Sequence, residues 1–276
     1  MPELPETETI ARDLDAELTG ATVVNVVVHR ADVLRETTAE MLAKSLTNSR
    51  ISRVWRRAKL VVLNFENPVS HIVVQPRFTG ALLIDDGNLP DDQREYLTVT
   101  FALDDQRLLH YRDVRRLGTV AHMTANRFAA YAGKLGPEPL DAALTSSEFS
   151  ALVRASKRPI KMLLMDQAKL GGVGNIYANE ALWLAGIDPS RQSSSLCEAE
   201  SSLLLEQLRA VLTASIAARG TSFRDYRDAR GNRGSFVEQL AVYGRGGEPC
   251  LRCNRRLIDT HAIDGRTTVF CSNCQR

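Results

Sequence analysis

Apolar side chains recur at a helical spacing near the amino terminus. Ile10, Leu14 and Leu18 follow one another at intervals of four, with charged residues between them, which predicts an amphipathic helix over Glu3–Leu18. Gly20 comes shortly after, where a helix of this kind commonly ends. One helix with a single apolar face is therefore the first element expected.

From Ala21 to about Val120 the pattern changes to short runs rich in β-branched and aromatic residues. Turn sequences such as Asp85-Asp86-Gly87-Asn88 and Asp104-Asp105 separate the runs. The predicted strands are Thr22–Val28, Leu60–Phe65, His71–Val74, Gly80–Ile84, Leu97–Leu103 and Arg107–Tyr111. Several short strands at this spacing favour an antiparallel sandwich or barrel.

Lys134–Leu140 reads as a linker, because a glycine and two prolines interrupt it. Helical periods beyond it predict helices over 146–156, 159–166, 175–185 and 198–219. The polar stretch Thr221–Gly234, rich in glycine and arginine, is expected to be a mobile loop. The predicted divisions are an N-terminal domain over 1–133, a helical domain over 134–219, a loop and connector over 220–239, and a cysteine-rich hairpin over 240–276.

The composition of the 276 residues is that of an ordinary soluble globular protein, with 44% hydrophobic and 25% charged residues. Apolar stretches such as Val23–Val28 are too short to span a bilayer. The acidic, proline-broken start does not resemble a secretory signal. These features argue against a membrane protein, a secreted disulfide scaffold and a fibrous protein.

A formal net charge of +2 hides an uneven distribution. The last 58 residues carry 11 arginines against six acids, a balance of +5. A second basic cluster consists of Arg50, Arg53, Arg56, Arg57 and Lys59. Such patches suit a polyanion such as nucleic acid, although solvated surface charge explains either cluster alone equally well.

Four of the five cysteines form two Cys-x-x-Cys pairs, Cys250 with Cys253 and Cys271 with Cys274, separated by 17 residues. This spacing predicts one tetrahedral, structural Zn²⁺ site on a hairpin. Two disulfides are the alternative, but nothing in the sequence indicates an oxidising compartment. The remaining Cys197 is expected to be a small buried hydrophobe.

The chain starts with Met1-Pro2-Glu3. Removal of Met1 would leave Pro2 as a secondary amine, and α-amino groups have a pKa of about 8, so a useful fraction is neutral and nucleophilic at pH 7. Its attack on a sugar aldehyde carbon gives an iminium cation that acidifies the neighbouring C2′–H and permits β-elimination. Glu3 could donate a proton to the ring oxygen. Alone, however, the same start fits a helix lead-in with proline near its first turn.

Several further motifs occur together with this start. They are Pro2-Glu3-Leu4-Pro5-Glu6, Arg56-Arg57-Ala58-Lys59, Asp113-Val114-Arg115-Arg116-Leu117-Gly118, Leu135-Gly136-Pro137-Glu138-Pro139-Leu140, Gly172-Val173-Gly174-Asn175-Ile176-Tyr177-Ala178 and the cysteine hairpin. In this order they closely resemble the formamidopyrimidine-DNA glycosylase (Fpg/Nei) family over essentially the whole chain. Leu4 favours the formamidopyrimidine branch over the endonuclease VIII branch.

The resemblance implies an α+β fold of two domains. The first is an N-terminal helix with an antiparallel β-sandwich, and the second is a helical domain with a helix-two-turns-helix motif and a zinc-finger β-hairpin. It also implies that Pro2 is the Schiff-base nucleophile, that Glu3 is its acid/base partner, and that Lys59 donates a proton during elimination and contacts phosphate. Arg266 matches the arginine that clamps phosphates beside the lesion, a task that suits a planar guanidinium.

Further DNA contacts follow from the resemblance. Asn175 opens a helix after a glycine-rich turn, where N–H groups favour phosphate. Lys157 is a better match than Lys161 for another backbone contact. Gln75 stands where the family often has a phosphate-contacting histidine, and Arg94 falls near a DNA-contact position.

An everted base leaves a gap in the duplex that needs a wedge. The matching positions are Phe78, Arg115 and Leu117, and core packing is the alternative for Phe78 and Leu117. Loop 222–235 matches the segment that caps an everted 8-oxoguanine. Glu6 could line the lesion pocket, or it could be an ordinary acid at a helix start.

The expected function is that of a bifunctional DNA glycosylase and AP lyase, which excises oxidised purines and cleaves the strand by β,δ-elimination. Two alternatives stay open: an endonuclease VIII-like glycosylase for oxidised pyrimidines, and a non-catalytic zinc-ribbon DNA-binding protein. The expected partner is damaged double-stranded DNA, without a membrane. A monomer in a bacterial cytoplasm, associated with the nucleoid through DNA, is expected.

Overall fold

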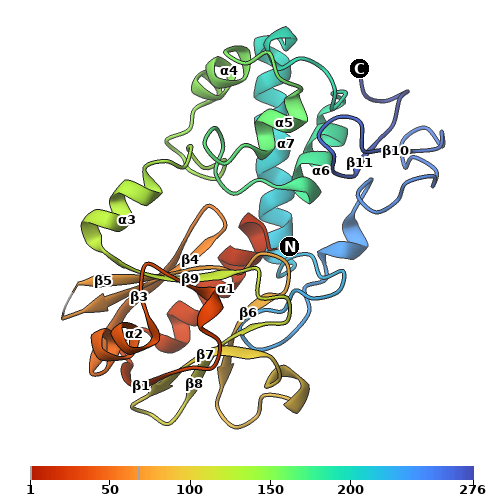
Figure 1. Ribbon diagram of the computed structural model, residues 1–276. Helices are drawn as coiled ribbons and strands as arrows, with labels where there is room; N and C mark the ends of the chain where they lie inside the picture. The colour runs from red at the N-terminus through yellow and green to blue at the C-terminus, as the bar shows by residue number, and fades with distance from the viewer. Residues whose placement is uncertain (1, 68) are drawn as a thin grey trace. The chain divides into compact units, whose positions relative to one another are not determined.

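The computed structural model of the chain describes residues 2–67 and 69–276. The chain folds into two compact units, whose elements are labelled in Figure 1. The first unit contains the chain through Gly133 together with Ala218–Val237, and the second contains Lys134–Ala217 and Glu238–Arg276. The four-part division expected from the sequence stays a prediction, but Ala218–Val237 groups with the N-terminal residues.

Helices and strands alternate irregularly in the first unit. Its helices are α1 (Leu4–Leu18), α2 (Ala39–Leu46) and α3 (Ala125–Ala132). Its strands are β1 (Thr22–Val28), β2 (Leu34–Arg35), β3 (Ser49–Arg57), β4 (Leu60–Glu66), β5 (Ser70–Gln75), β6 (Gly80–Asp85), β7 (Leu97–Leu103), β8 (Leu108–Asp113) and β9 (Thr119–Thr124). Short 3-10 helices cover Ala31–Val33 and Asp91–Gln93.

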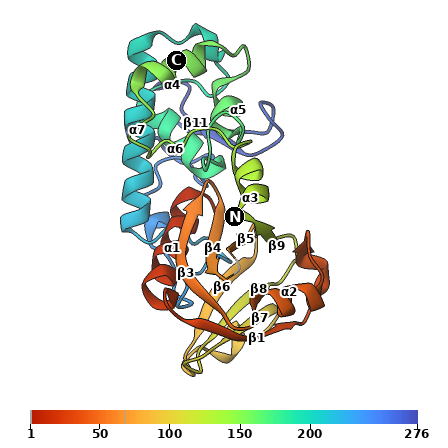
Figure 2. The ribbon, with the colours of Figure 1, turned by 90° about the vertical axis from the view of Figure 1, so that its left-hand side faces the viewer.

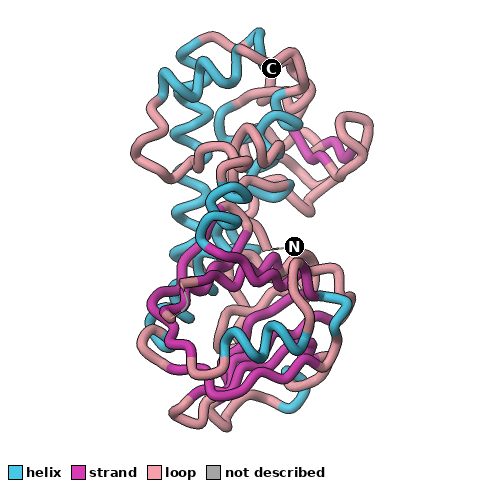
Figure 3. The backbone as a smooth tube through the Cα atoms, turned by 60° about the vertical axis from the view of Figure 1, so that its left-hand side comes forward, coloured by secondary structure: helices cyan, strands magenta, loops and turns pink. Residues whose placement is uncertain are grey.

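All nine of these strands belong to one sheet, in the order β2-β9-β5-β4-β3-β1-β7-β8-β6. Neighbours are antiparallel except for β2 and β9, which are parallel. The sheet folds over so that its strands lie in two layers (Figure 3). One hydrophobic core joins both halves, with Leu63 and Val74 from one and Phe101 and Leu109 from the other. The predicted sandwich is therefore confirmed.

The helix α1 lies against β3 and β4 (Figure 2). It begins after Glu3 with a capping box, in which Glu3 and Glu6 each accept the other's backbone N–H. Ile10, Leu14 and Leu18 are fully buried, so the predicted apolar face is the one that packs. The start of α1 is thus fixed at both its cap and its core face.

The second unit is mainly helical. It contains α4 (Ser146–Arg154), α5 (Ile160–Met165), α6 (Asn175–Ala185), α7 (Glu198–Ala217) and the hairpin β10 (Ile258–Thr260) with β11 (Thr268–Phe270). A 3-10 helix covers Ser193–Ser195, and another, Phe236–Gln239, spans the boundary with the first unit. The four predicted helices are confirmed to within a few residues at each end. No described helix is both long and apolar enough to cross a membrane.

Two predictions about single segments are wrong. Cys197 is exposed rather than buried. The stretch Thr221–Gly234 is not a loosely attached loop, because Tyr226 and Ala229 are buried in the core of the first unit. Five elements of the first unit were not predicted: β2, β3, β9, α2 and α3.

Candidate functional site

The predicted catalytic pair Pro2 and Glu3 lies at the start of α1, and both residues are buried. The backbone N–H of Glu3 donates to Oε2 of Glu6 at 2.8 Å, which holds the dipeptide against the first helical turn. The prediction that Met1 is removed concerns a residue outside the described part of the chain. The geometry therefore shows where an amine at Pro2 would be fixed.

The carboxylate of Glu6 links this corner to the segment that returns from α7. Its Oε1 accepts the backbone N–H of Thr221 at 2.8 Å, while its Oε2 holds Glu3. Gly220 has a φ of +88°, and a Cβ there would come within 2.9 Å of the Tyr226 ring. Only glycine fits this position comfortably. One buried carboxylate thus contacts both the proposed nucleophile's neighbour and the base of the capping segment.

Lys59 lies in the tight turn between β3 and β4, where Arg57 pairs with Leu60. Ala58, also in this turn, has a φ of +51°. The carbonyl of Ala58 accepts bonds from Nη1 of Arg56 at 3.1 Å and from Oγ1 of Thr7 at 3.4 Å. Because Thr7 lies in the first turns of α1, this turn is attached to the same helix start as Pro2 and Glu3. Lys59 itself is half-buried.

The three wedge candidates come from two neighbouring loops of the first unit. Phe78, between β5 and β6, is 45% exposed, and Leu117, between β8 and β9, is 43% exposed. The guanidinium of Arg115 lies 5.3 Å from the centroid of the Phe78 ring, a cation–π distance. Core packing, the alternative for Phe78 and Leu117, does not fit such exposed side chains. The structure thus brings Phe78 and Arg115 together, and Leu117 is exposed on the same loop as Arg115.

Two other predicted contacts have different surroundings. Gln75 ends β5 and is half-buried. Arg94 is held by acids of its own unit, with Nε 2.7 Å from Asp85 and Nη1 2.9 Å from Asp91. Hydrogen bonds from Arg94 hold the pKa of the Asp85 carboxyl well below its usual range. Phosphate contacts by Gln75 and Arg94 stay predictions, and Arg94 would have to share its charge with two carboxylates.

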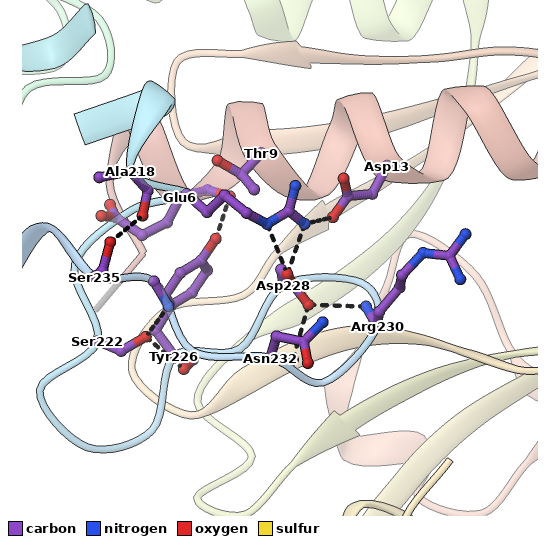
Figure 4. A network of polar contacts seen from close by, with 12 residues as sticks. Glu6, Thr9, Asp13, Ala218, Ser222, Tyr226, Asp228, Arg230, Asn232 and Ser235 are labelled. Carbon is purple, nitrogen blue, oxygen red and sulfur yellow. Dashed lines mark hydrogen bonds and ion pairs between the residues drawn. The ribbon is translucent and has the colours of Figure 1, made fainter. Parts of the chain in front are cut away.

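The predicted capping segment is anchored on its C-terminal side. Buried Asp228 accepts the N–H groups of Arg230 and Asn232 at 3.0 and 2.8 Å. Nε of Arg219 donates to Asp228 at 2.9 Å, and Nη2 of Arg219 contacts Asp13 on α1 at 2.5 Å. Figure 4 shows this network, with Tyr226 pointing toward Glu6. The fixed limb is therefore 226–232, whereas Phe223 in the other limb is exposed.

In the second unit, Asn175 is the first residue of α6 and donates from Nδ2 to the carbonyl of Thr267 at 2.9 Å. Lys157 lies in the loop before α5, not on a helix, and is exposed. The phosphate contact suggested for Lys161 is wrong, because this lysine is fully buried and its Nζ lies 3.3 Å from Asp264 and 2.7 Å from Oγ1 of Thr268. Lys161 instead fixes the loop of the hairpin.

That loop carries the exposed Arg266 between β10 and β11. Its backbone N–H donates to Oδ1 of Asp264 at 3.0 Å, so the backbone is held while the guanidinium stays accessible. Between α5 and the loop is a pocket of about 420 Å³, lined by Met162, Met165, Arg158 and Arg266. Its lining also includes Asp264 and Asp166, and Asp166 pairs with Nη1 of Arg158 at 2.7 Å.

The four cysteines of the hairpin lie together, with all four sulfur atoms within 4.8 Å of one another. Cys253 and Cys271 are 3.5 Å apart, and Cys250 and Cys274 are 3.9 Å apart. Four sulfurs about 2.3 Å from one ion at tetrahedral angles would be about 3.8 Å apart. Burial raises the pKa of Cys274 to about 12, so four thiolates would need a compensating cation. The donor set fits Zn²⁺.

Sequence reasoning missed the residues that fix these loops. Asp113 stands first in the motif Asp113–Gly118 but was given no role, and Thr79 was not considered. Asp228 and Asp264 were counted only as charges. An aspartate in an irregular segment commonly accepts the backbone N–H two residues further on, as Asp228 does from Arg230 and Asp264 does from Arg266. That signal could have marked these two aspartates.

Two family profiles match the chain. The profile of the formamidopyrimidine-DNA glycosylase N-terminal domain matches residues 1–120, and that of the formamidopyrimidine-DNA glycosylase H2TH domain matches residues 135–227. A formamidopyrimidine-DNA glycosylase of Heliobacterium modesticaldum is 39% identical over 283 residues, with 100% of both chains covered.

Solved structures give the same result. A Lactococcus lactis FPG mutant in complex with a Fapy-dG containing DNA has a TM-score of 0.90 and 30% identity, with 100% of both chains covered. The wild-type Lactococcus lactis FPG in complex with an oxidized pyrimidine containing DNA has a TM-score of 0.89, at the same identity and coverage. Both likenesses extend over the two units.

Proposed function

The chain belongs to the formamidopyrimidine-DNA glycosylase family, and on that premise we propose that Pro2 is the nucleophile of its glycosylase and AP lyase reactions. The enzyme is a DNA repair glycosylase. One observation supports the assignment of Pro2. Glu3, which follows Pro2, and the turn that contains Lys59 are both hydrogen-bonded to the first turns of α1.

The reaction begins when the Pro2 nitrogen attacks C1′ and the damaged base leaves with the electrons of the glycosidic bond. Glu3 gives its proton to the sugar ring oxygen, the ring opens, and an iminium cation forms on Pro2. The cation draws electrons from the C2′–H bond, so that proton is lost and the 3′ phosphate leaves. Lys59, fixed in the turn beside α1, serves the proton transfers of elimination.

The 5′ phosphate leaves in the second elimination, which Arg266 assists by holding the phosphates beside the lesion sugar. Asn175 and Lys157 add backbone contacts, and Phe78, Arg115 and Leu117 fill the gap left by the everted base. Cys250, Cys253, Cys271 and Cys274 would hold one Zn²⁺. Such a closed four-thiolate site supplies folding energy rather than reactivity.

Oxidised purines are the proposed substrates, in duplex DNA. The Fapy-dG complex of the Lactococcus lactis mutant supports this class. Oxidised pyrimidines are a second candidate, which the complex of the wild-type protein with such DNA favours. We infer a monomer that is associated with DNA in a bacterial cytoplasm, since the matched relative is bacterial.

Borohydride trapping on DNA with one abasic site tests the nucleophile. We expect a covalent adduct whose mass maps to Pro2. Pro2→Gly and Glu3→Gln should lower the rate of strand cleavage by about 100-fold or more, as expected for a lost nucleophile or general acid. Glu40→Gln, an exposed acid on α2, is the matched control and should keep the parent rate.

An adduct that maps to an interior lysine would overturn the assignment. If the parent protein forms no adduct and cleaves no strand, the remaining alternative, a non-catalytic zinc-ribbon DNA-binding protein, gains support. A panel of duplexes with single purine or pyrimidine lesions then separates the two substrate classes.

A further inference from the structure

The two loops that carry Phe78, Arg115 and Leu117 meet over a buried carboxylate. Asp113, the last residue of β8, is 1% exposed. The loops occupy 76–79, between β5 and β6, and 114–118, between β8 and β9. The backbone N–H of Gly80 donates to the carbonyl of Pro76 at 3.0 Å and closes the first loop on itself. Side-chain contacts join the first loop to the second.

Those contacts are hydrogen bonds that lead from Arg115 through Thr79 to Asp113. The backbone N–H of Arg115 donates to Oγ1 of Thr79 at 3.0 Å, and the Thr79 hydroxyl donates to Oδ1 of Asp113 at 2.5 Å. The other oxygen of Asp113 accepts the backbone N–H of Gly118 at 2.8 Å. A single carboxylate therefore joins Thr79 of the first loop to both ends of the second loop. Hydrogen bonds to an ionised and buried acceptor are among the stronger ones in proteins.

Tyr111 supports this carboxylate from below. The Tyr111 side chain is fully buried, and its hydroxyl donates to Oδ2 of Asp113 at 3.4 Å. Burial and the charge of Asp113 raise the pKa of Tyr111, so the phenol stays a neutral donor. A Cβ at Gly80 would come 2.7 Å from this hydroxyl oxygen, and one at Gly118 would come 1.9 Å from it. The two glycines let both loops approach the same oxygen.

Both loops also hold a residue in an unfavourable backbone conformation. Arg77 and Arg116 each have a φ of +51°, in the left-handed region that non-glycine residues seldom adopt. Such conformations persist only where the surroundings fix them. The bond from Gly80 to the Pro76 carbonyl closes the turn that contains Arg77. The bonds to Thr79 and Asp113 hold the loop that contains Arg116. Phe78 lies between Arg77, which has a positive φ, and the hydrogen-bonded Thr79. Arg115 is itself hydrogen-bonded to Thr79 and directly precedes Arg116, the other residue with a positive φ.

We propose that Asp113, acting through Thr79, is a positioning residue that keeps the two loops in one arrangement, so that Phe78, Arg115 and Leu117 enter the duplex as a unit. The inference rests on the proposed function, since it presupposes that these side chains fill the gap of an everted base. It assigns no direct contact with DNA to Asp113 or Thr79. Functional groups held by a second layer of hydrogen bonds lose efficiency when that layer is removed.

Thr79→Val tests the proposal, because it removes the hydroxyl at nearly constant volume. The matched control is Thr98→Val: Thr98 is also buried and donates to the Tyr111 carbonyl at 2.8 Å, but it lies on β7, outside both loops. Thr79→Ser, which keeps the hydroxyl, should restore the parent behaviour. Thermal unfolding of each variant gives its stability beside the functional readouts.

Two readouts separate positioning from general damage. A 2-aminopurine placed opposite the lesion reports insertion of the wedge by its fluorescence, and borohydride trapping on a single-stranded abasic oligonucleotide reports chemistry that requires no base pair to open. For Thr79→Val we expect wedge insertion to fall by about tenfold, as for loss of a hydrogen bond to a charged group. Trapping on the single strand should stay within about twofold of the parent protein, because the chemistry there bypasses the wedge.

Equal insertion by Thr79→Val and the parent protein would overturn the proposal, as would an equal loss in Thr98→Val. If Thr79→Val does not fold, Asp113→Asn replaces it, since the amide cannot accept from both Thr79 and Gly118. A parent protein that traps single-stranded abasic DNA but shows no insertion signal contradicts the wedge alone. A parent that traps nothing contradicts the proposed function and this inference with it.

Discussion

Two irregular segments of the molecule, one in each unit, are held by a cation–carboxylate pair. In the first unit, Arg219 contacts Asp228 and so fixes the limb 226–232. In the second unit, Lys161 contacts Asp264 and so fixes the loop with Arg266. The Arg219 side chain is 46% exposed, whereas Lys161 is fully buried.

The difference shows how much each segment depends on its cation. Asp228 also accepts the N–H groups of Arg230 and Asn232, two bonds in which Arg219 takes no part, and water can reach the half-exposed guanidinium. Lys161 also donates to Oγ1 of Thr268 and the carbonyl of Thr267, where water cannot easily take its place. A buried ion pair is costly to break on one side, and an exposed pair is not. The capping segment should therefore tolerate the loss of its cation better than the hairpin loop.

Metal removal should have the largest effect. Cys253→Ser, or a chelator, should unfold the hairpin over 240–276, because structural zinc contributes about 10 kcal/mol or more to such small modules. Amide exchange should then be fast in the hairpin but unchanged in the sandwich. Cys197→Ser, at the exposed cysteine outside the cluster, is the control. An intact hairpin in the metal-free protein would show that Lys161 and α6 hold it without metal.

The next largest effect is expected for Lys161→Met. This variant keeps the length of the side chain but removes its charge, and it should lower the free energy of unfolding by about 3 kcal/mol, as for one side of a buried pair. Chemical denaturation measures it. Lys157→Met, at an exposed lysine nearby, should be neutral in the same measurement. Equal stabilities for the two variants would remove the distinction between the two anchors.

The smallest effect is expected for Arg219→Gln. A half-exposed ion pair contributes about 0.5–1 kcal/mol, so global stability should change little. Faster amide exchange should be confined to 226–232 and should leave α1 protected. Arg224→Gln, at an exposed position nearby in the chain, should not accelerate exchange there. A loss for Arg219→Gln as large as that for Lys161→Met would contradict the role assigned to burial.

The sequence predicted best the elements whose residues are mainly apolar. Strands Thr22–Val28 and Leu97–Leu103 and helix Asn175–Ala185 have the predicted bounds. Strand β3 was missed, because its exposed positions are arginines that stand out as a charge cluster rather than as one face of a strand. Alternating burial along β3 becomes visible only when its partner β4 is known.

Contacts between distant residues explain the rest. The period of α5 does not reveal that Lys161 points toward Asp264, about a hundred positions later. Nothing local in Thr221–Gly234 indicates that Tyr226 joins the core of the N-terminal unit. The proposed catalytic and metal-binding positions could be named from the sequence because short motifs mark them, whereas the residues that anchor them become visible only in the tertiary structure.

The return of Ala218–Val237 to the first unit bears on how the protein is made. Tyr226 and Ala229 complete the sandwich core, yet 84 residues, 134–217, are synthesised between Gly133 and this segment. A nascent chain that ends near Ala217 exposes an unfinished apolar surface, a state that attracts chaperones and favours misfolding. The second unit also includes Glu238–Arg276, which are synthesised last. Translation must therefore approach its end before either half can close.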